Sequence, residues 1–405
     1  MNIGSKLFIS KIFQFKLRNF SLNSLYSKPA IINRTNNNYL FKRTSHGKIV
    51  GSWLLTCSGM VYVAVALGGV TRLTESGLSM VTWKFLGENF PTNQTSWKNE
   101  FEKYKEFPEF KILNKNMTLE EFKRIWWMEY IHRMWGRLIG VSFIVPASYF
   151  WLKNMLNPKA KRQIALLGCL IGCQGLMGWY MVKSGLENSF DGPADVPRVS
   201  QYRLAAHLSL ALIIYSIFLH SALDHLFPVK NYASNIFNSN SLHGNLKKLK
   251  QMKFLANSCK GLVFLTAVSG AFVAGLDAGL IYNTFPKMAG KWIPDDIWAL
   301  HPTIKNFTEN PTMVQLQHRT LGILTLGTVT YVGFISRRYN LYKRASKAAS
   351  AVVIAVYLQA TLGITTLLNH VPTLLAAAHQ SVSVALLSMT IWLCHEMKYI
   401  KKCIK

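Results

Sequence analysis

Apolar residues along this chain gather into runs long enough to cross a membrane, and short polar segments separate these runs. Each run is close to 20 residues long, which is the length that spans a hydrocarbon core of about 30 Å. We therefore predict an all-α integral membrane protein with eight transmembrane helices. Their expected positions are near residues 50–70, 126–150, 163–182, 202–222, 257–276, 313–335, 347–368 and 373–395.

Short motifs recur in the same order in the two halves of this pattern. Internal symmetry of this kind is common in membrane proteins and reflects a repeated structural unit. We predict two repeat-related four-helix bundles, at residues 48–222 and 257–396, joined by a polar linker at 223–256. The matching motifs are HRMWG (132–136) and HRTLG (318–322), LAAH (204–207) and AAAH (376–379), QGLMG (174–178) and QATLG (359–363), and GGVTRLTESGLS (68–79) and GAFVAGLDAGLI (270–281).

The composition supports the membrane class and narrows the expected partners. Hydrophobic residues make up 50% of the 405 residues and charged residues only 16%, whereas a soluble protein carries about a quarter charged residues. The net charge of +28 is spread over short loops and the N-terminal segment, so we expect contact with membrane lipid and not with nucleic acid. The six cysteines contain no CxxC pair and predict neither a disulfide framework nor a zinc site.

Basic residues indicate the orientation and the compartment. The loops after the second, fourth and sixth apolar runs are rich in Lys and Arg, so the positive-inside rule places both termini and the linker in the matrix. Residues 1–47 hold eight Lys or Arg and no acid, which is typical of a mitochondrial transit peptide. We therefore expect a multi-pass protein of the mitochondrial inner membrane with a basic tail at 397–405.

Four of the apolar runs carry a histidine about five residues from their start, roughly 8 Å below the surface at 1.5 Å per residue. Ionisable groups at that depth are costly and need a partner. A neutral imidazole is a good axial ligand of heme iron, and two of them from neighbouring helices hold it from both faces. The repeat pairs His132 with His207 and His318 with His379, which predicts two heme sites.

The alternative for each of these histidines is a hydrogen bond to a neighbouring helix. Their equal depth on repeat-related helices favours ligation. The six other histidines of the membrane region lie at the ends of runs or in loops, and we interpret them as surface or interfacial residues: His220, His225, His243, His301, His370 and His395.

One carboxylate breaks the repeat. Glu129 precedes His132 by three positions and shares its helix face, whereas Gln315 occupies the corresponding place in the second half. A carboxylate beside only one heme site can move protons or stabilise a cationic intermediate. The alternative is an interfacial residue paired with Arg133 or Arg124.

Cations near the membrane surface are candidate partners for heme propionates. Each of them has an alternative role as an anchor to lipid headgroups. The glycine-rich GGVTR and GAFVAG stretches indicate close helix packing or room for a flat macrocycle, and not phosphate binding. The candidate propionate contacts are Arg72, Arg133, Arg137, Arg203 and Arg319.

Several long motifs, placed in the same order, resemble the mitochondrial branch of the heme A synthase family over residues 48–396. The resemblance implies an inner-membrane enzyme with eight helices that oxidises the C8 methyl of heme O to the formyl group of heme A, for cytochrome c oxidase assembly. The motifs are GGVTRLTESGLSMVTW, EYIHRMWGRLIG, GWYMVKSGL, RVSQYRLAAHL and GAFVAGLDAGLIYNTFPKM.

The resemblance also assigns roles to the candidate residues. It implies that His132 and His207 hold the substrate heme O, that His318 and His379 hold a heme b cofactor, and that Glu129 is catalytic. It implies self-association into a homo-oligomer, heme O synthase as the source of substrate, and an electron acceptor for which a ferredoxin-type protein is one candidate. Relatives in another branch carry a cysteine pair in the first outer loop, which residues 71–124 lack.

Two other functions compete with this interpretation. A non-catalytic di-heme b electron carrier would need ligands at two depths, one near each membrane face. A transporter or heme chaperone would need a site at the middle of the membrane. The predicted ligands all lie near one face, which argues against both.

Overall fold

The computed structural model describes residues 45–84, 87–187, 198–227, 242–339 and 341–398. Every named element in these ranges is helical, which confirms the all-helical prediction for the described residues. The predicted transit peptide (1–47) lies outside these ranges except for its last three residues, as does most of the predicted tail (397–405). The long helices are α1 (Ser45–Leu73), α4 (Leu119–Leu152), α5 (Pro158–Glu187), α6 (Gln201–Leu226), α8 (Leu242–Gly275), α10 (Pro311–Arg338), α11 (Lys343–Leu368) and α12 (Thr373–Met397).

Six of these helices are long and apolar enough to cross a membrane: α1, α5, α6, α8, α11 and α12. The other two, α4 and α10, are equally long and pack beside them. Both carry charged and amide side chains of the candidate site, and these residues lower their hydropathy. Six of the eight predicted spanning helices therefore have the length and hydropathy of a membrane span, and spanning by α4 and α10 stays a prediction.

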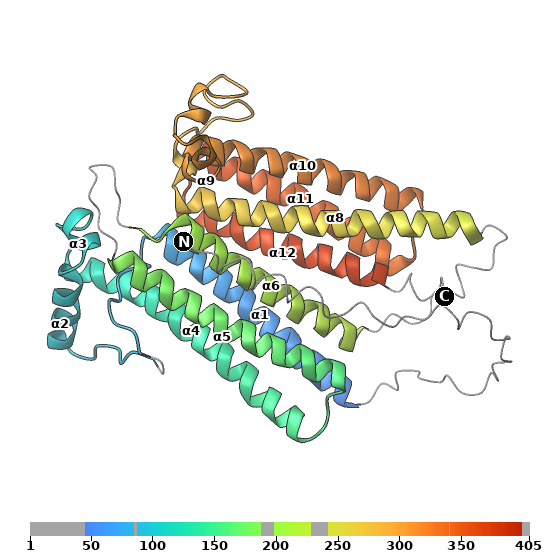
Figure 1. Ribbon diagram of the computed structural model, residues 1–405, viewed down its shortest axis with the longest axis horizontal. Helices are drawn as coiled ribbons and strands as arrows, with labels where there is room; N and C mark the ends of the chain where they lie inside the picture. The colour runs from blue at the N-terminus through green and yellow to red at the C-terminus, as the bar shows by residue number, and fades with distance from the viewer. Residues whose placement is uncertain (1–44, 85–86, 188–197, 228–241, 340, 399–405) are drawn as a thin grey trace, which may run out of the picture. The chain divides into compact units, whose positions relative to one another are not determined.

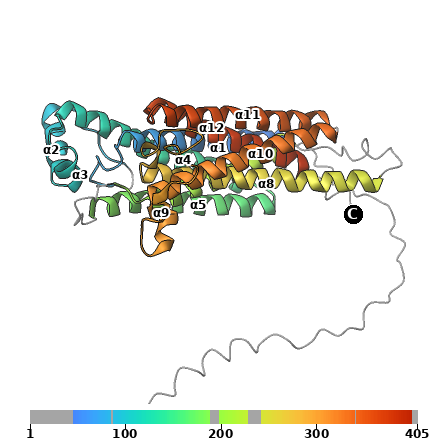
Figure 2. The same cartoon turned by 90° about the horizontal axis from the view of Figure 1, so that it is seen from above.

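Helices of the first half pack mainly against one another, and so do those of the second half (Figure 1). Helix α1 packs against α4 and α6, and α5 packs against α6. In the second half α8 packs against α10 and α12, and α11 packs against α10 and α12. Contacts of α1 with α12 and of α6 with α8 join the halves, and the long helices run along a common direction when seen from above (Figure 2).

Capping residues explain where α4 and α10 begin. Thr118 and Glu121 form a capping box, in which the Thr118 side chain accepts from the Glu121 backbone N–H and Glu121 accepts from the Thr118 N–H. Helix α4 therefore starts seven residues before the predicted position of 126. Asn310 caps α10 by accepting from Thr312 N at 2.9 Å, and Pro311 occupies the first turn, where its missing N–H costs nothing.

The predicted linker at 223–256 is partly helical. Helix α6 continues to Leu226, and α8 begins at Leu242; residues 228–241 between them lie outside the described part. The first turns of α8 are rich in lysine, and this composition led to the prediction of a polar linker there. Apolar residues nevertheless recur every three or four positions, and this spacing builds one buried helix face. The buried residues are Met252, Ala256, Cys259 and Val263.

Polar contacts reinforce the packing between the halves. Gln380, which follows His379 on α12, donates to the Val65 carbonyl of α1 at 2.8 Å. Its side chain fills the space over Gly69, where an added Cβ would lie 1.8 Å from the Gln380 oxygen. A glycine at this position therefore allows α12 to approach α1 closely.

An aromatic cluster builds a small unit outside the spanning segments. It consists of α2 (Gln94–Lys105), α3 (Pro108–Ile112) and the start of α4. Inside it the Glu109 side chain is 4% exposed and accepts from the Tyr104 hydroxyl at 3.0 Å. Burial raises the pKa of Glu109 to about 8, and the Tyr104 hydrogen bond opposes this shift. The buried members of the cluster are Met80, Trp97, Phe101, Tyr104, Phe122 and Trp126.

The raised pKa of Glu109 predicts a pH-dependent stability of this unit. Because the folded state holds the proton more tightly than the unfolded state, stability is full below the ordinary pKa of 4.5 and is lost as pH rises through about 8. Glu109→Gln should remove this dependence and stabilise the unit at pH 8 by a few kcal/mol, at about 1.4 kcal/mol for each unit by which the pKa is raised. Hydrogen-exchange protection of residues 94–118, corrected for the intrinsic rate at each pH, measures the effect.

The exposed Glu102 provides the control for this experiment. Its side chain is 68% exposed and pairs with Lys105 on the same helix. Glu102→Gln should leave the wild-type loss of protection between pH 5 and pH 8 in place. An equal pH dependence in wild type and Glu109→Gln would show that another group controls the unit.

Candidate heme site

Each of the four predicted ligand histidines lies against a glycine of a neighbouring helix. An added Cβ on any of these glycines would lie closer to the ring Cε1 atom than most side-chain contacts do, so a larger residue would press against each ring. The glycine–histidine pairs and the Cβ–Cε1 distances are Gly68–His132 (3.0 Å), Gly178–His207 (3.2 Å), Gly270–His318 (3.3 Å) and Gly363–His379 (2.7 Å).

The structure brings the two histidines of the second half together. The ring centroids of His318 on α10 and His379 on α12 lie 6.4 Å apart, with the ring planes at 86°. In the first half, His207 on α6 lies within electrostatic reach of His132 on α4. The pairing predicted from the repeat is thus compatible with the positions of all four rings.

The second-half pair fits an iron atom between two imidazoles. A metal bound by a ring nitrogen at about 2 Å on each side sets the two ring centroids about 6 Å apart, close to the observed 6.4 Å. The buried Nδ1 atoms of His132, His207 and His379 also have no hydrogen-bond partner among the described residues. Buried polar atoms without partners are costly, so these nitrogens are candidates for binding a metal.

Side chains around the histidines hold the rings in place. The Ser269 hydroxyl of α8 lies 2.7 Å from His318 Nδ1, which leaves Nε2 as the nitrogen free to bind a metal. Gln174 of α5 lies with its Nε2 atom 3.3 Å from His207 Nε2, and Gln359 of α11 is 3.4 Å from His379 Nε2. The two glutamines come from the matching QGLMG and QATLG motifs.

Glu129 is buried and fully engaged by hydrogen bonds. One carboxylate oxygen accepts from the Ser79 hydroxyl and from the Met80 backbone N–H, both at 2.7 Å. The other oxygen pairs with Arg133, which also donates to the carbonyls of Met80 and Thr82. The carboxylate therefore connects α4 to the segment that follows α1. The ion pair between Glu129 and Arg133 is the one that the alternative interpretation of Glu129 predicted.

Gln315 builds the same connection in the second half. It donates to the Ala278 carbonyl at 2.9 Å, and its oxygen accepts from Arg319. Arg319 also donates to the carbonyls of Tyr282 and Thr284. A neutral amide is therefore sufficient for the connection, and the extra feature of the first half is a negative charge.

The five candidate propionate arginines all have protein contacts near the histidine-bearing ends of the helices. Arg133 and Arg319 are described above. Arg72 pairs with Asp277 at 2.8 Å, Arg137 donates to the Lys84 carbonyl, and Arg203 lies over the Tyr180 ring at 5.1 Å. The buried Arg203 Nη1 atom has no hydrogen-bond partner among the described residues. Propionate contact stays a prediction for all five.

Sequence reasoning missed several residues of this region. The motif repeat contained Gln174 and Gln359, but only the structure shows that they reach the histidines. Ser269 has no counterpart in the first half, where Leu67 precedes Gly68, so the repeat gave no signal for it. His395, which we interpreted as interfacial, is fully buried, because α12 packs against the end of α6. Its Nε2 atom lies 3.2 Å from the Asp224 Oδ1 atom.

Enlarging Gly363 should disturb the heme site directly. An alanine Cβ would lie 2.7 Å from His379 Cε1, so the ring has to move from its ligand position. We expect Gly363→Ala to weaken heme binding by about 10-fold or more. Heme content per protein, read from the visible spectrum of purified protein, measures the loss.

Gly175→Ala is the matched control, because a Cβ on Gly175 of α5 meets nothing within 4 Å. This variant should keep the wild-type heme content. Equal heme content in Gly363→Ala and wild type would show that the His379 ring is not a ligand in the position described.

The sequence is similar to known proteins over most of its length. The profile of the COX15-CtaA family, described as cytochrome oxidase assembly protein, matches residues 51–391. Heme A synthase COX15 of Bos taurus is 53% identical over 356 residues, which cover 88% of this chain and 83% of that protein. Heme A synthase COX15 of Saccharomyces cerevisiae is 39% identical over 94% of this chain and 82% of that protein, and heme A synthase of Nitrosospira multiformis is 42% identical over 87% and 94%.

Proposed function

The chain belongs to the COX15-CtaA family of cytochrome oxidase assembly proteins, and from this premise we propose that it is a heme A synthase. Its reaction oxidises the C8 methyl of heme O, through a hydroxylated intermediate, to the formyl group of heme A. The observation that carries the proposal is the set of four histidines, each seated against a glycine of a neighbouring helix. Two histidines from neighbouring helices can supply both imidazole ligands of a heme iron.

We assign the substrate to the first half and a heme b cofactor to the second. His132 and His207 then hold heme O, while His318 and His379 hold heme b at the pair whose centroid distance of 6.4 Å fits an iron. This assignment assumes two repeat-related four-helix bundles and eight spanning helices. The four glycine–histidine contacts at corresponding motif positions support that architecture.

Glu129 is the proposed catalytic residue. Each of its oxygens already accepts hydrogen bonds, so its negative charge can stabilise a developing positive charge on the substrate without moving any donor. Accepting a proton from an attacking water would require Ser79 or Arg133 to turn away first. The geometry therefore favours electrostatic stabilisation over general-base catalysis for Glu129.

The two oxidation steps each remove two electrons from the methyl carbon. In this proposal water supplies the oxygen, the second step gives a hydrated aldehyde, and loss of one water leaves the formyl group. When bound, heme b supplies a redox centre that passes these electrons onward. In this proposal the four histidines would bind the two macrocycles, and Glu129 would supply the negative charge.

The setting of the reaction follows from the membrane helices and the relatives. We propose a multi-pass protein of the mitochondrial inner membrane with both termini in the matrix, which the basic loops support. Heme O synthase would deliver the substrate, and a ferredoxin-type protein is a candidate acceptor of the electrons. Association into a homo-oligomer is part of the same proposal.

The proposal is tested by supplying heme O to the purified protein with an electron acceptor and separating the extracted hemes by chromatography. We expect heme O to decrease while a hydroxylated heme and then heme A appear. Unchanged heme O alongside bound heme b would instead identify a di-heme b electron carrier. Protein with the His132 ligand removed should give no heme A.

A further inference from the structure

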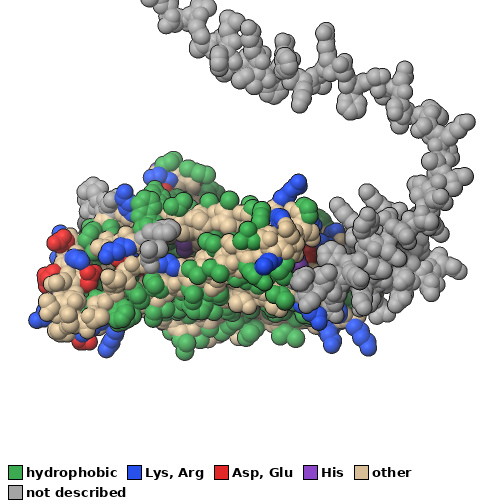
Figure 3. Space-filling view, turned by 90° about the horizontal axis from the view of Figure 1, so that it is seen from below, with side chains coloured by type: hydrophobic (Ala, Val, Ile, Leu, Met, Phe, Trp, Pro, Cys, Tyr) green, Lys and Arg blue, Asp and Glu red, His purple; other side chains and the backbone are tan. Residues whose placement is uncertain are grey.

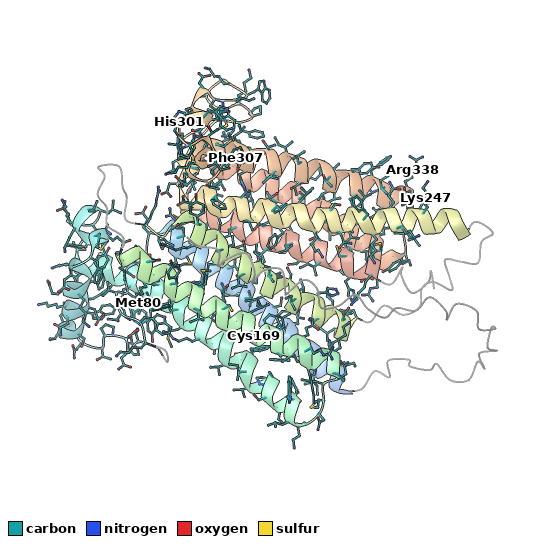
Figure 4. All side chains as sticks on the ribbon, in the orientation of Figure 1. Met80, Cys169, Lys247, His301, Phe307 and Arg338 are labelled. Atoms are coloured by element: carbon teal, nitrogen blue, oxygen red, sulfur yellow. The ribbon has the colours of Figure 1, made fainter. Side chains whose placement is uncertain are left out.

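The ends of α8 and α10 away from the histidines line a half-open pocket of about 420 Å³. Figure 4 shows the Arg338 side chain at this end of α10 and Lys247 beside it on α8. The size suits a small polar group, since ligand pockets begin at about 300 Å³. The lining residues are Lys248, Gln251, Tyr331, Ile335, Arg338 and Tyr339.

Among the described residues, no acidic side chain compensates the positive charge of this pocket. Lys248 and Arg338 line it, and no carboxylate does. Neither cation forms an ion pair with a described residue. The Tyr339 hydroxyl donates to the Gln251 side-chain oxygen at 2.6 Å, and Lys248 Nζ lies 5.9 Å from the Tyr339 ring centroid. These contacts fix the positions of Gln251 and Tyr339 and leave the two cations available to bind an anion.

The pocket lies at the membrane boundary. Arg338 follows His318 by 20 positions on α10, which corresponds to about 30 Å along the helix and to the thickness of a hydrocarbon core. The lysine-rich first turns of α8 lie next to the pocket, at the start of a helix that is long and apolar enough to cross a membrane. Figure 3 shows the same distribution, with Lys and Arg side chains at the two ends and a largely hydrophobic band between them.

We propose that this pocket binds the phosphodiester headgroup of an anionic phospholipid such as cardiolipin. Lys248 and Arg338 contact the phosphate oxygens, as cations in pockets between membrane helices do. The Tyr331 ring, which is 47% exposed, forms the apolar side along which an acyl chain leaves the headgroup. A free phosphate ion would satisfy the two cations but would leave this apolar side unused.

The competing explanation is that these cations only obey the positive-inside rule. That rule places Lys and Arg at this face whether or not they form a site. A matched pair of variants separates the two explanations. Lys248→Gln with Arg338→Gln removes two charges from the pocket, whereas Lys250→Gln with Arg337→Gln removes two exposed charges that lie next to it and do not line it.

Binding is measured on delipidated full-length protein in neutral detergent, by native mass spectrometry with added cardiolipin, phosphatidylcholine or inorganic phosphate. We expect cardiolipin to bind wild type and the Lys250/Arg337 variant equally, and the Lys248/Arg338 variant about 10-fold or more weakly. The thermal stabilisation that cardiolipin gives should fall in parallel. All four changed side chains are exposed, so neither double variant should unfold the protein. A melting temperature without lipid that equals that of wild type confirms that each variant is folded.

Three results would overturn the proposal. Equal weakening in both double variants would show a general attraction of the basic face. Equal binding of cardiolipin by all three proteins would show that the pocket takes no part. Stabilisation of wild type by inorganic phosphate as strong as that by cardiolipin, and lost only in the Lys248/Arg338 variant, would identify a phosphate-ion site instead of a lipid site.

Discussion

Replacing His318 by alanine is expected to remove heme b from the protein and to lower heme A formation by about 100-fold or more. The Ser269 hydroxyl lies 2.7 Å from His318 Nδ1, so the other ring nitrogen is the one left to bind a metal between His318 and His379. Without this imidazole the metal keeps only one axial ligand from the protein. The visible and paramagnetic resonance spectra of purified protein report the loss of the low-spin heme.

Ser269→Ala gives a graded form of the same experiment. Loss of a hydrogen bond to a ligand histidine typically costs 10-fold to 100-fold in metal affinity or activity, so heme b should bind more weakly without disappearing. Ser216→Ala on α6 is the control, because that hydroxyl donates to the Leu212 carbonyl one turn earlier. If His318→Ala retained a wild-type low-spin spectrum, the ligand assignment in the second half would be wrong.

Glu129→Gln is expected to lower heme A formation by about 10² to 10⁴-fold while the bound heme b remains. The substitution removes the negative charge and keeps the volume of the side chain. Gln315 occupies the corresponding place in the second half with hydrogen bonds to Ala278 and Arg319, so an amide is compatible with this local fold. Extracted hemes should contain heme O or the hydroxylated intermediate and almost no heme A.

Ser79→Ala separates the charge of Glu129 from its position. This variant removes one hydrogen bond to the carboxylate and leaves the Met80 and Arg133 contacts in place. We expect a smaller loss than in Glu129→Gln, because the negative charge and two of its three contacts remain. Heme A made at the wild-type rate by Glu129→Gln would reduce Glu129 to an ion-pair residue.

The sequence was sufficient to predict the helical membrane class and the four histidines, because apolar periodicity and motif repeats are local signals. The glycines of the GGVTR and GAFVAG stretches were expected to serve packing or a macrocycle, and Gly68 and Gly270 indeed receive the rings of His132 and His318. Only the structure shows which helix each glycine faces.

Features that depend on pairing between distant segments could not be predicted. The contact of Gln380 with Val65 and Gly69 joins residues more than 300 positions apart, and no local sequence pattern predicts it. The early start of α4 was different, because the Thr118–Glu121 capping box is visible in the sequence and was overlooked. The start of α8 was also missed, since lysines mask its apolar stripe in a hydropathy average.

The most direct test of the account compares the heme content of two repeat-related ligand variants, His207→Ala and His379→Ala, purified from cells that make heme O. We predict that His207→Ala retains heme b and loses heme O and heme A, whereas His379→Ala loses heme b. Loss of the same heme from both variants, or retention of heme b by His379→Ala, would contradict the assignment of substrate to one half and cofactor to the other.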